Sequence, residues 1–133
     1  MKPPLKKFHL IAGLVTLLIF PLTGAYMRFH LAADFAASDR LRFSTRAGHV
    51  YILLSALIHI SFGAYLRLSA KPWRTNLQMV ASLLLFVSTA LVIVAFFAES
   101  KVSLDRPLSL LAMISALTGT LLHALIAAWE KPE

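Results

Sequence analysis

The stretch TNLQMVASLLLFVSTALVIVAFFA, residues 75–98, contains no Asp, Glu, Lys or Arg over 24 consecutive positions. An α-helix rises about 1.5 Å per residue, so this stretch is long enough to cross a hydrocarbon core roughly 30 Å thick. Three other stretches share the property: residues 8–27 and 47–66, with 20 residues each, and residues 107–129, with 23. The sequence therefore predicts four membrane-spanning helices.

The composition supports a membrane protein. Of the 133 residues, 59% are hydrophobic and only 14% are charged, which is too little charge for a soluble domain of this length. Backbone amides inside lipid must be paired within each segment, and the apolar stretches lack the alternation typical of barrel strands. We expect an all-α integral membrane protein, a single domain over residues 1–133, whose four helices form an antiparallel up-down bundle. The expected spans are 8–28, 47–67, 76–98 and 107–129, joined by loops 29–46, 68–75 and 99–106.

The charges outside the spans predict an orientation. The N-terminal segment resembles a secretory signal, with Lys2, Lys6 and Lys7 before an apolar run, but the run is longer than a signal core, so we interpret it as an uncleaved first helix. An even number of spans puts both termini on one side. The Lys-rich N-terminus and the short loop 68–75 favour the cytoplasm for that side, in an inner or plasma membrane. The net charge of +7 then favours contact with anionic headgroups, and no nucleic-acid partner is expected.

Two similar pentapeptides, GAYMR at 24–28 and GAYLR at 63–67, end the first and second spans. Successive spans run in opposite directions, so the two copies would lie at opposite membrane surfaces. Interfacial Tyr and outward-reaching Arg side chains explain both copies, and each glycine would let a neighbouring helix approach closely. The repeat therefore predicts membrane packing and no shared site.

Two histidines lie well inside their spans, where an ionisable side chain is costly and indicates a functional site by default. Each lies on a stripe of small residues, Ser55, His59 and Gly63 in the second span and Gly119, His123 and Ala127 in the fourth. The two helices would run in the same direction, and the depths of the histidines differ by about 4 Å at 1.5 Å per residue. The small neighbours would leave room for a flat ligand or for another backbone.

The sequence leaves two interpretations of these histidines open. Facing imidazoles are suitable axial ligands of haem b, with His59 and His123 holding the iron and Ser55, Gly63, Gly119 and Thr120 surrounding the ring. His9 is a substitute partner for His123 in that arrangement. Alternatively, the histidines only hydrogen-bond across helices, with Ser82, Ser88, Thr89, Ser115 and Thr118 as partners.

Other functional classes have little support in the sequence. No span contains a carboxylate, so no intramembrane acid–base pair is available, and no catalytic residue and no metal other than haem iron is predicted. The absence of cysteine excludes thiolate sites and covalent haem attachment through cysteine. We expect an accessory or structural membrane subunit that packs against partner membrane proteins or against itself in the lipid bilayer. The alternatives are a haem b electron carrier and, with less support, a small dimeric transporter.

Two predictions concern individual segments. Leu31 and Phe35, in the first long loop, could give a short helix lying on the bilayer. Residues 86–97, FVSTALVIVAFF, are apolar nearly all round, which predicts a helix face turned to lipid or covered by a partner.

Overall fold

The computed structural model describes residues 4–99 and 105–129, and this part of the chain is entirely helical apart from short connections. The helices are α1 (Leu5–His30), α2 (Ala32–Ala37), α3 (Asp39–Tyr65), α4 (Pro72–Ala98) and α5 (Pro107–Trp129). Four of them, α1, α3, α4 and α5, are long and apolar enough to cross a membrane. The predicted class, an all-helical membrane protein with four spanning helices, agrees with this architecture.

Helix ends follow local chemistry more closely than the charge boundaries do. The helix α3 begins at Asp39, eight residues before the span predicted at 47, because the Ser38 hydroxyl accepts a hydrogen bond from the Leu41 amide at 3.3 Å and caps the helix. The helix α4 begins at Pro72, whose missing N–H costs nothing at a first helical position. The short helix expected around Leu31 and Phe35 is present as α2.

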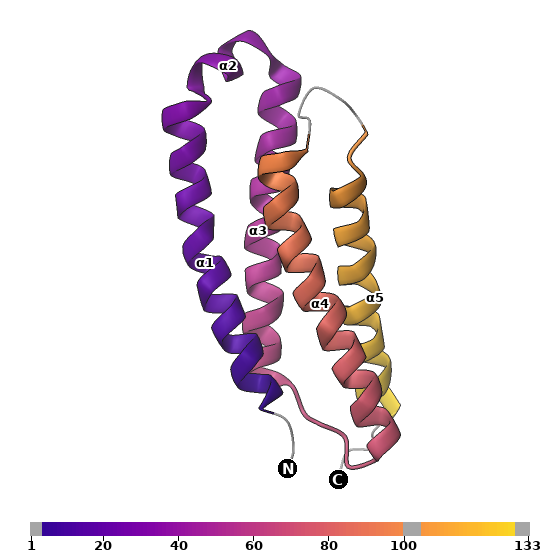
Figure 1. Ribbon diagram of the computed structural model, residues 1–133. Helices are drawn as coiled ribbons and strands as arrows, with labels where there is room; N and C mark the ends of the chain where they lie inside the picture. The colour runs from indigo at the N-terminus through magenta and orange to yellow at the C-terminus, as the bar shows by residue number, and fades with distance from the viewer. Residues whose placement is uncertain (1–3, 100–104, 130–133) are drawn as a thin grey trace.

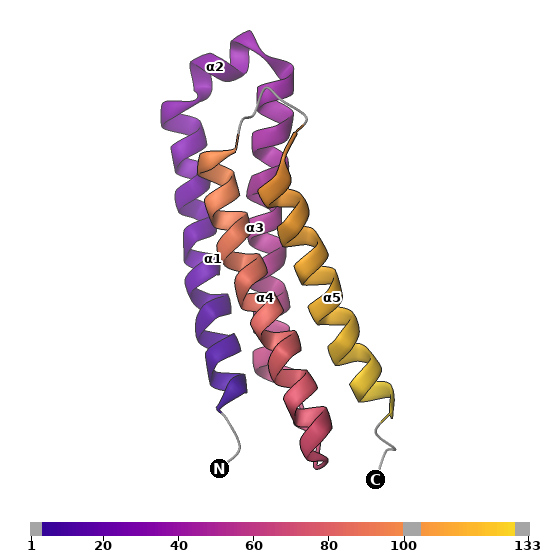
Figure 2. The same cartoon turned by 45° about the vertical axis from the view of Figure 1, so that its right-hand side comes forward.

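The four long helices lie side by side, with the start of α1 and the end of α5 at one end of the molecule and α2 at the other (Figure 1). We call these the terminal end and the α2 end. The helix pairs α1 and α3, and α4 and α5, pack closely along their lengths, and α3 and α4 join the two pairs. Among the described residues α5 has extensive contact with α4 alone, and it diverges from α3 toward the terminal end (Figure 2).

The helix α4 is the most buried of the four, so residues 86–97 have a buried face as well as the exposed face that the sequence predicts. Val92 and Phe96 are 5% and 1% exposed and form an apolar cluster with Ile52 and Ala112. Only part of the helix surface, including Val94 and Phe97, is exposed. An all-round apolar sequence is equally suited to a central helix, and the sequence pattern does not distinguish the two.

A buried ion pair closes the α2 end. Glu99, 8% exposed, accepts hydrogen bonds from Arg106 Nε at 3.2 Å and from the amide and hydroxyl of Ser109. Arg106 also donates to the Ser44 carbonyl on α3 at 3.3 Å. Burial alone would raise the pKa of Glu99, but the hydrogen bonds from Ser109 and Arg106 outweigh it and hold the pKa below its ordinary value. This network therefore ties the start of α5 to α4 and α3.

Candidate functional site: a histidine cluster between the helices

Three glycines allow the helices to approach closely enough to bring histidines together. A Cβ atom on Gly13 would lie 2.7 Å from the Ile60 nitrogen, and one on Gly63 would lie 2.8 Å from the Leu10 Cα atom, so α1 and α3 touch backbone to backbone. A Cβ atom on Gly119 would lie 2.7 Å from the Ala81 carbonyl oxygen, which sets α5 against α4 in the same way. These close contacts place His9 beside His59, and His123 beside Ser82.

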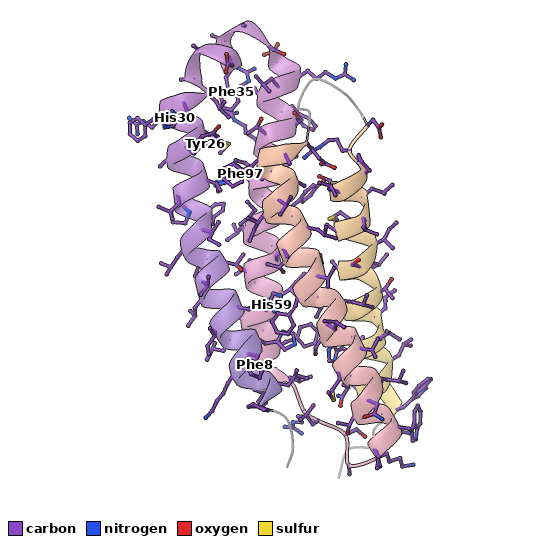
Figure 3. The ribbon with its side chains drawn as sticks, viewed as in Figure 1. Phe8, Tyr26, His30, Phe35, His59 and Phe97 are labelled. Carbon is purple, nitrogen blue, oxygen red and sulfur yellow. The ribbon has the colours of Figure 1, made fainter. Side chains whose placement is uncertain are left out.

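The cluster is a continuous chain of hydrogen-bonded side chains from four helices. His59 Nε2 lies 2.9 Å from Thr89 Oγ1, and His59 Nδ1 lies 2.8 Å from His9 Nδ1. His9 Nε2 lies 2.9 Å from Ser82 Oγ, which lies 3.0 Å from His123 Nε2. His9, His59 and Ser82 are at most 1% exposed and His123 is 4% exposed. Figure 3 shows His59 directed between the helices, whereas His30 points away from the bundle.

The direction of each hydrogen bond follows from one carbonyl group. Thr89 Oγ1 donates its only hydrogen to the Leu85 carbonyl at 3.1 Å, because a carbonyl can only accept. Thr89 must then accept from His59 Nε2–H. In a neutral imidazole the second nitrogen is an acceptor, so His9 Nδ1–H donates to His59 Nδ1, and Ser82 Oγ–H donates to His9 Nε2. Ser82 Oγ in turn accepts from His123 Nε2–H.

The chain therefore ends at His123 Nδ1, which is left as a bare acceptor. This atom is buried and has no hydrogen-bond partner. Within residues 4–99 and 105–129, one other buried side-chain polar atom shares this condition, Arg74 Nε. A buried polar group without a partner is unusual in a folded protein and requires an explanation, such as a missing ligand or water.

Aromatic rings fill the space around the imidazoles. The Phe86 ring stacks on His9 with centroids 4.8 Å apart and lies at the same distance from His59. The Phe62 ring packs against His123 at 4.5 Å and against His9 at 5.5 Å. These rings exclude water from the middle of the chain of hydrogen bonds, so its groups must pair with one another.

A cavity of about 960 Å³ adjoins the cluster at the terminal end, between the last turns of α3, the first turns of α4 and the second half of α5. His123 and Phe62 belong to its wall, so the last residue of the hydrogen-bonded chain borders the cavity, while its Nδ1 atom is itself buried. Its other lining residues are Ser61, Tyr65, Leu66, Arg67, Leu68, Ser69, Ala70, Lys71, Arg74, Gln78, Thr120, Ala124 and Ala127.

The residues predicted as a haem site are only partly brought together. The hydrogen-bond partners of His59 are His9 and Thr89, and that of His123 is Ser82; Ser55 and Thr120 do not take these positions. Thr120 lines the cavity with His123, while Ser55 is buried within α3.

The two predicted pocket glycines, Gly63 and Gly119, admit neighbouring backbones, which is the second of the two uses expected for the small residues. Both ring nitrogens of His59 are bonded, so iron could bind there only after these bonds were broken. Within the described residues no group of three or more His, Cys, Asp or Glu side chains is arranged to hold a metal ion.

His49 lies apart from the cluster, at the half of the molecule nearer α2. Its Nδ1 atom lies 2.9 Å from Thr23 Oγ1, and its ring stacks on Phe20 with centroids 4.0 Å apart. Because Thr23 donates to the Phe20 carbonyl, His49 Nδ1–H is the donor in the pair with Thr23. His9 and His49 therefore share no centre.

The prediction that paired His59 with His123 did not include the position of His9 between His59 and Ser82. In the sequence, His9 is a third histidine near the same end of the spans, and it is predicted only as a substitute partner for His123. Ser82 and Thr89 were named among the hydroxyls available for interhelical bonds. Comparison with protein-family models, curated proteins and solved structures finds no significant match to the chain.

Proposed function

We propose that this protein is an accessory or structural subunit of a membrane complex, formed by four spanning helices in an antiparallel bundle with both termini in the cytoplasm. The observation that carries the proposal is the pairing of buried polar groups with one another across helices. His9, His59, Ser82 and Thr89 satisfy each other without a ligand, so they hold α1, α3 and α4 in register. A core of this kind favours packing over translocation or catalysis.

The helix α5 is the element that we assign to contact with a partner. Within the described chain it packs extensively on α4 alone, and its large side chains Leu110, Leu117 and Leu121 are 63%, 62% and 52% exposed. A helix held along one side offers most of its surface to another membrane protein or to a second copy, at the cost only of displacing lipid.

Site-specific photo-crosslinking in native membranes tests this proposal. A photoreactive residue at Leu117 on α5 should give a defined adduct whose mass identifies a partner or a homodimer. The matched control is Leu18 on α1, which is 68% exposed and apolar. If neither position gives a protein adduct, and gentle detergent extraction yields a monomer without associated proteins, the accessory role is wrong.

The haem b alternative remains testable by an absorption spectrum. The observation in its favour is the convergence of three imidazoles from α1, α3 and α5 at one level of the molecule. Iron between His59 and His123 would require His59 to release His9 or Thr89. A sharp visible band in reduced, purified protein that is lost in His123→Ala would establish this function, whereas colourless protein from haem-replete cells would reject it.

A further inference from the structure

The cavity beside His123 is cationic at its mouth and apolar within. Arg67, Lys71 and Arg74 contribute three positive charges, and none of the described residues that line the cavity is acidic. Phe62, Ala124 and Ala127 provide apolar walls. An apolar cavity with a few convergent polar groups is the usual form of a small-ligand site, and this charge distribution fits an anionic amphiphile.

The rim of the cavity is preformed by the connection between α3 and α4. The Gln78 side chain accepts from the Ser69 amide at 3.0 Å and donates to the Arg67 carbonyl at 2.8 Å. The Thr75 hydroxyl donates to the Ser69 carbonyl at 2.9 Å. These bonds fix the backbone that carries Arg67 and Lys71, so little ordering would be required when a ligand binds.

The two buried polar atoms without partners both belong to residues that line this cavity. Arg74 Nε–H is a donor with no acceptor, although Arg74 Nη1 donates to the Trp129 carbonyl at 3.2 Å. His123 Nδ1, on a side chain that is 96% buried, is an acceptor with no donor, as the chain of hydrogen bonds requires. Both atoms lie behind the cavity wall, so the cationic side chains at the mouth, and not these two atoms, meet a ligand first.

The depth of the cavity selects the size of the ligand. Arg74 and Ser82, the partner of His123, are eight residues apart on α4, or about 12 Å along the helix axis. A free inorganic anion cannot fill a cavity of this depth, whereas a lipid with its head at the rim extends into it. Arginine matches the oxygen atoms of phosphate in geometry and charge.

We infer that this cavity binds a phosphate-bearing lipid, with its phosphate at Arg67, Lys71 and Arg74. The acyl chain leaves along Phe62 and Ala127 toward the bilayer. The inference is independent of the accessory role, because the cavity lies at the terminal end whether or not α5 meets a partner.

Fluorescence quenching of the two tryptophans gives a direct assay. Trp73 and Trp129 are the only tryptophans in the sequence, their ring centroids are 6.4 Å apart, and Arg74 contacts both residues. The probe is lysophosphatidylglycerol with a brominated acyl chain, which carries phosphate and a free backbone hydroxyl, titrated into protein in non-ionic detergent. Brominated lysophosphatidylcholine, which is zwitterionic, is the headgroup control. Glycerol phosphate, which has no acyl chain and no bromine, is the competitor that tests for a site binding free anions.

We expect saturable quenching by the anionic probe, at least fivefold weaker apparent binding of the zwitterionic one, and no competition by glycerol phosphate. Lys71→Gln and Arg74→Gln should each weaken binding of the anionic probe severalfold. Lys7→Gln, which removes an exposed cation at the same end but outside this cavity, should not.

Three results would overturn the inference. Equal binding of the two headgroups would remove the role of the phosphate. An equal loss in Lys7→Gln and Lys71→Gln would reduce the effect to general attraction between basic residues and anionic surfaces. Competition by glycerol phosphate would indicate a small-anion site. Arg74→Gln also removes the hydrogen bond to the Trp129 carbonyl. If this variant does not fold, the binding measured for Lys71→Gln decides whether the cations of the cavity hold the phosphate.

Discussion

Replacing Ser82 by alanine tests the hydrogen-bonded chain at its centre. The Ser82 hydroxyl is 1% exposed and bonds both His9 Nε2, at 2.9 Å, and His123 Nε2, at 3.0 Å. Interhelical side-chain hydrogen bonds in membrane proteins contribute about 0.6 kcal/mol on average and about 1.7 kcal/mol at most. Loss of two such bonds should therefore lower the free energy of unfolding by about 1.2 kcal/mol, with an upper limit of about 3.4 kcal/mol.

The matched control is Ser61→Ala, the same chemical change at an exposed position where the hydroxyl donates only to the Leu57 carbonyl of its own helix. We expect this variant to change stability by less than about 0.5 kcal/mol, as is usual for surface positions. Reversible unfolding in mixed micelles of non-ionic detergent and dodecyl sulfate, followed by circular dichroism, measures both. If Ser82→Ala is no less stable than Ser61→Ala, the cluster does not hold the helices together and the basis of the proposed structural role is removed.

Two further predictions concern the helix contacts and the α2 end. Gly119→Ala should destabilise the protein by about 1–3 kcal/mol, because its Cβ would lie 2.7 Å from the Ala81 carbonyl oxygen and the backbones must separate. The control Gly24→Ala should have a much smaller effect, since the nearest atom, in His49, lies 3.4 Å away; equal losses of thermal stability in detergent would refute the close approach of α4 and α5. Glu99 has a lowered pKa in the folded protein, so its contribution to stability is present above its ordinary pKa and is lost as the pH falls through the lowered value. Glu99→Gln should therefore reduce thermal stability at pH 7 and make the decline in acid shallower, whereas an unchanged melting profile between pH 7 and pH 3 would contradict the network described there.

The histidine cluster differs from a solvent-filled path. Its hydrogen bonds all run in one direction, from His123 through Ser82 and His9 to His59, and end at the Leu85 carbonyl through Thr89. A backbone carbonyl has no proton to give, so the chain ends at that point. The structural role uses this polarity, because the groups along the chain satisfy each other.

The sequence alone determined the all-helical class and the existence of four helices long and apolar enough to cross a membrane. Uninterrupted apolar stretches of 20 to 24 residues are governed by the thickness of the bilayer, which acts on each segment separately. It also singled out His59 and His123, because an ionisable residue inside such a stretch is costly wherever it lies.

Only the tertiary structure decided which residues meet. The approach of Gly63 to Leu10, and of Gly119 to Ala81, brings His9 and Ser82 into the cluster, and these contacts depend on pairings between helices that no single segment encodes. The central position of α4 was equally hidden, because lipid and a protein interior are both apolar and select the same side chains. Helix packing, and not hydrophobicity, therefore sets the site in this protein.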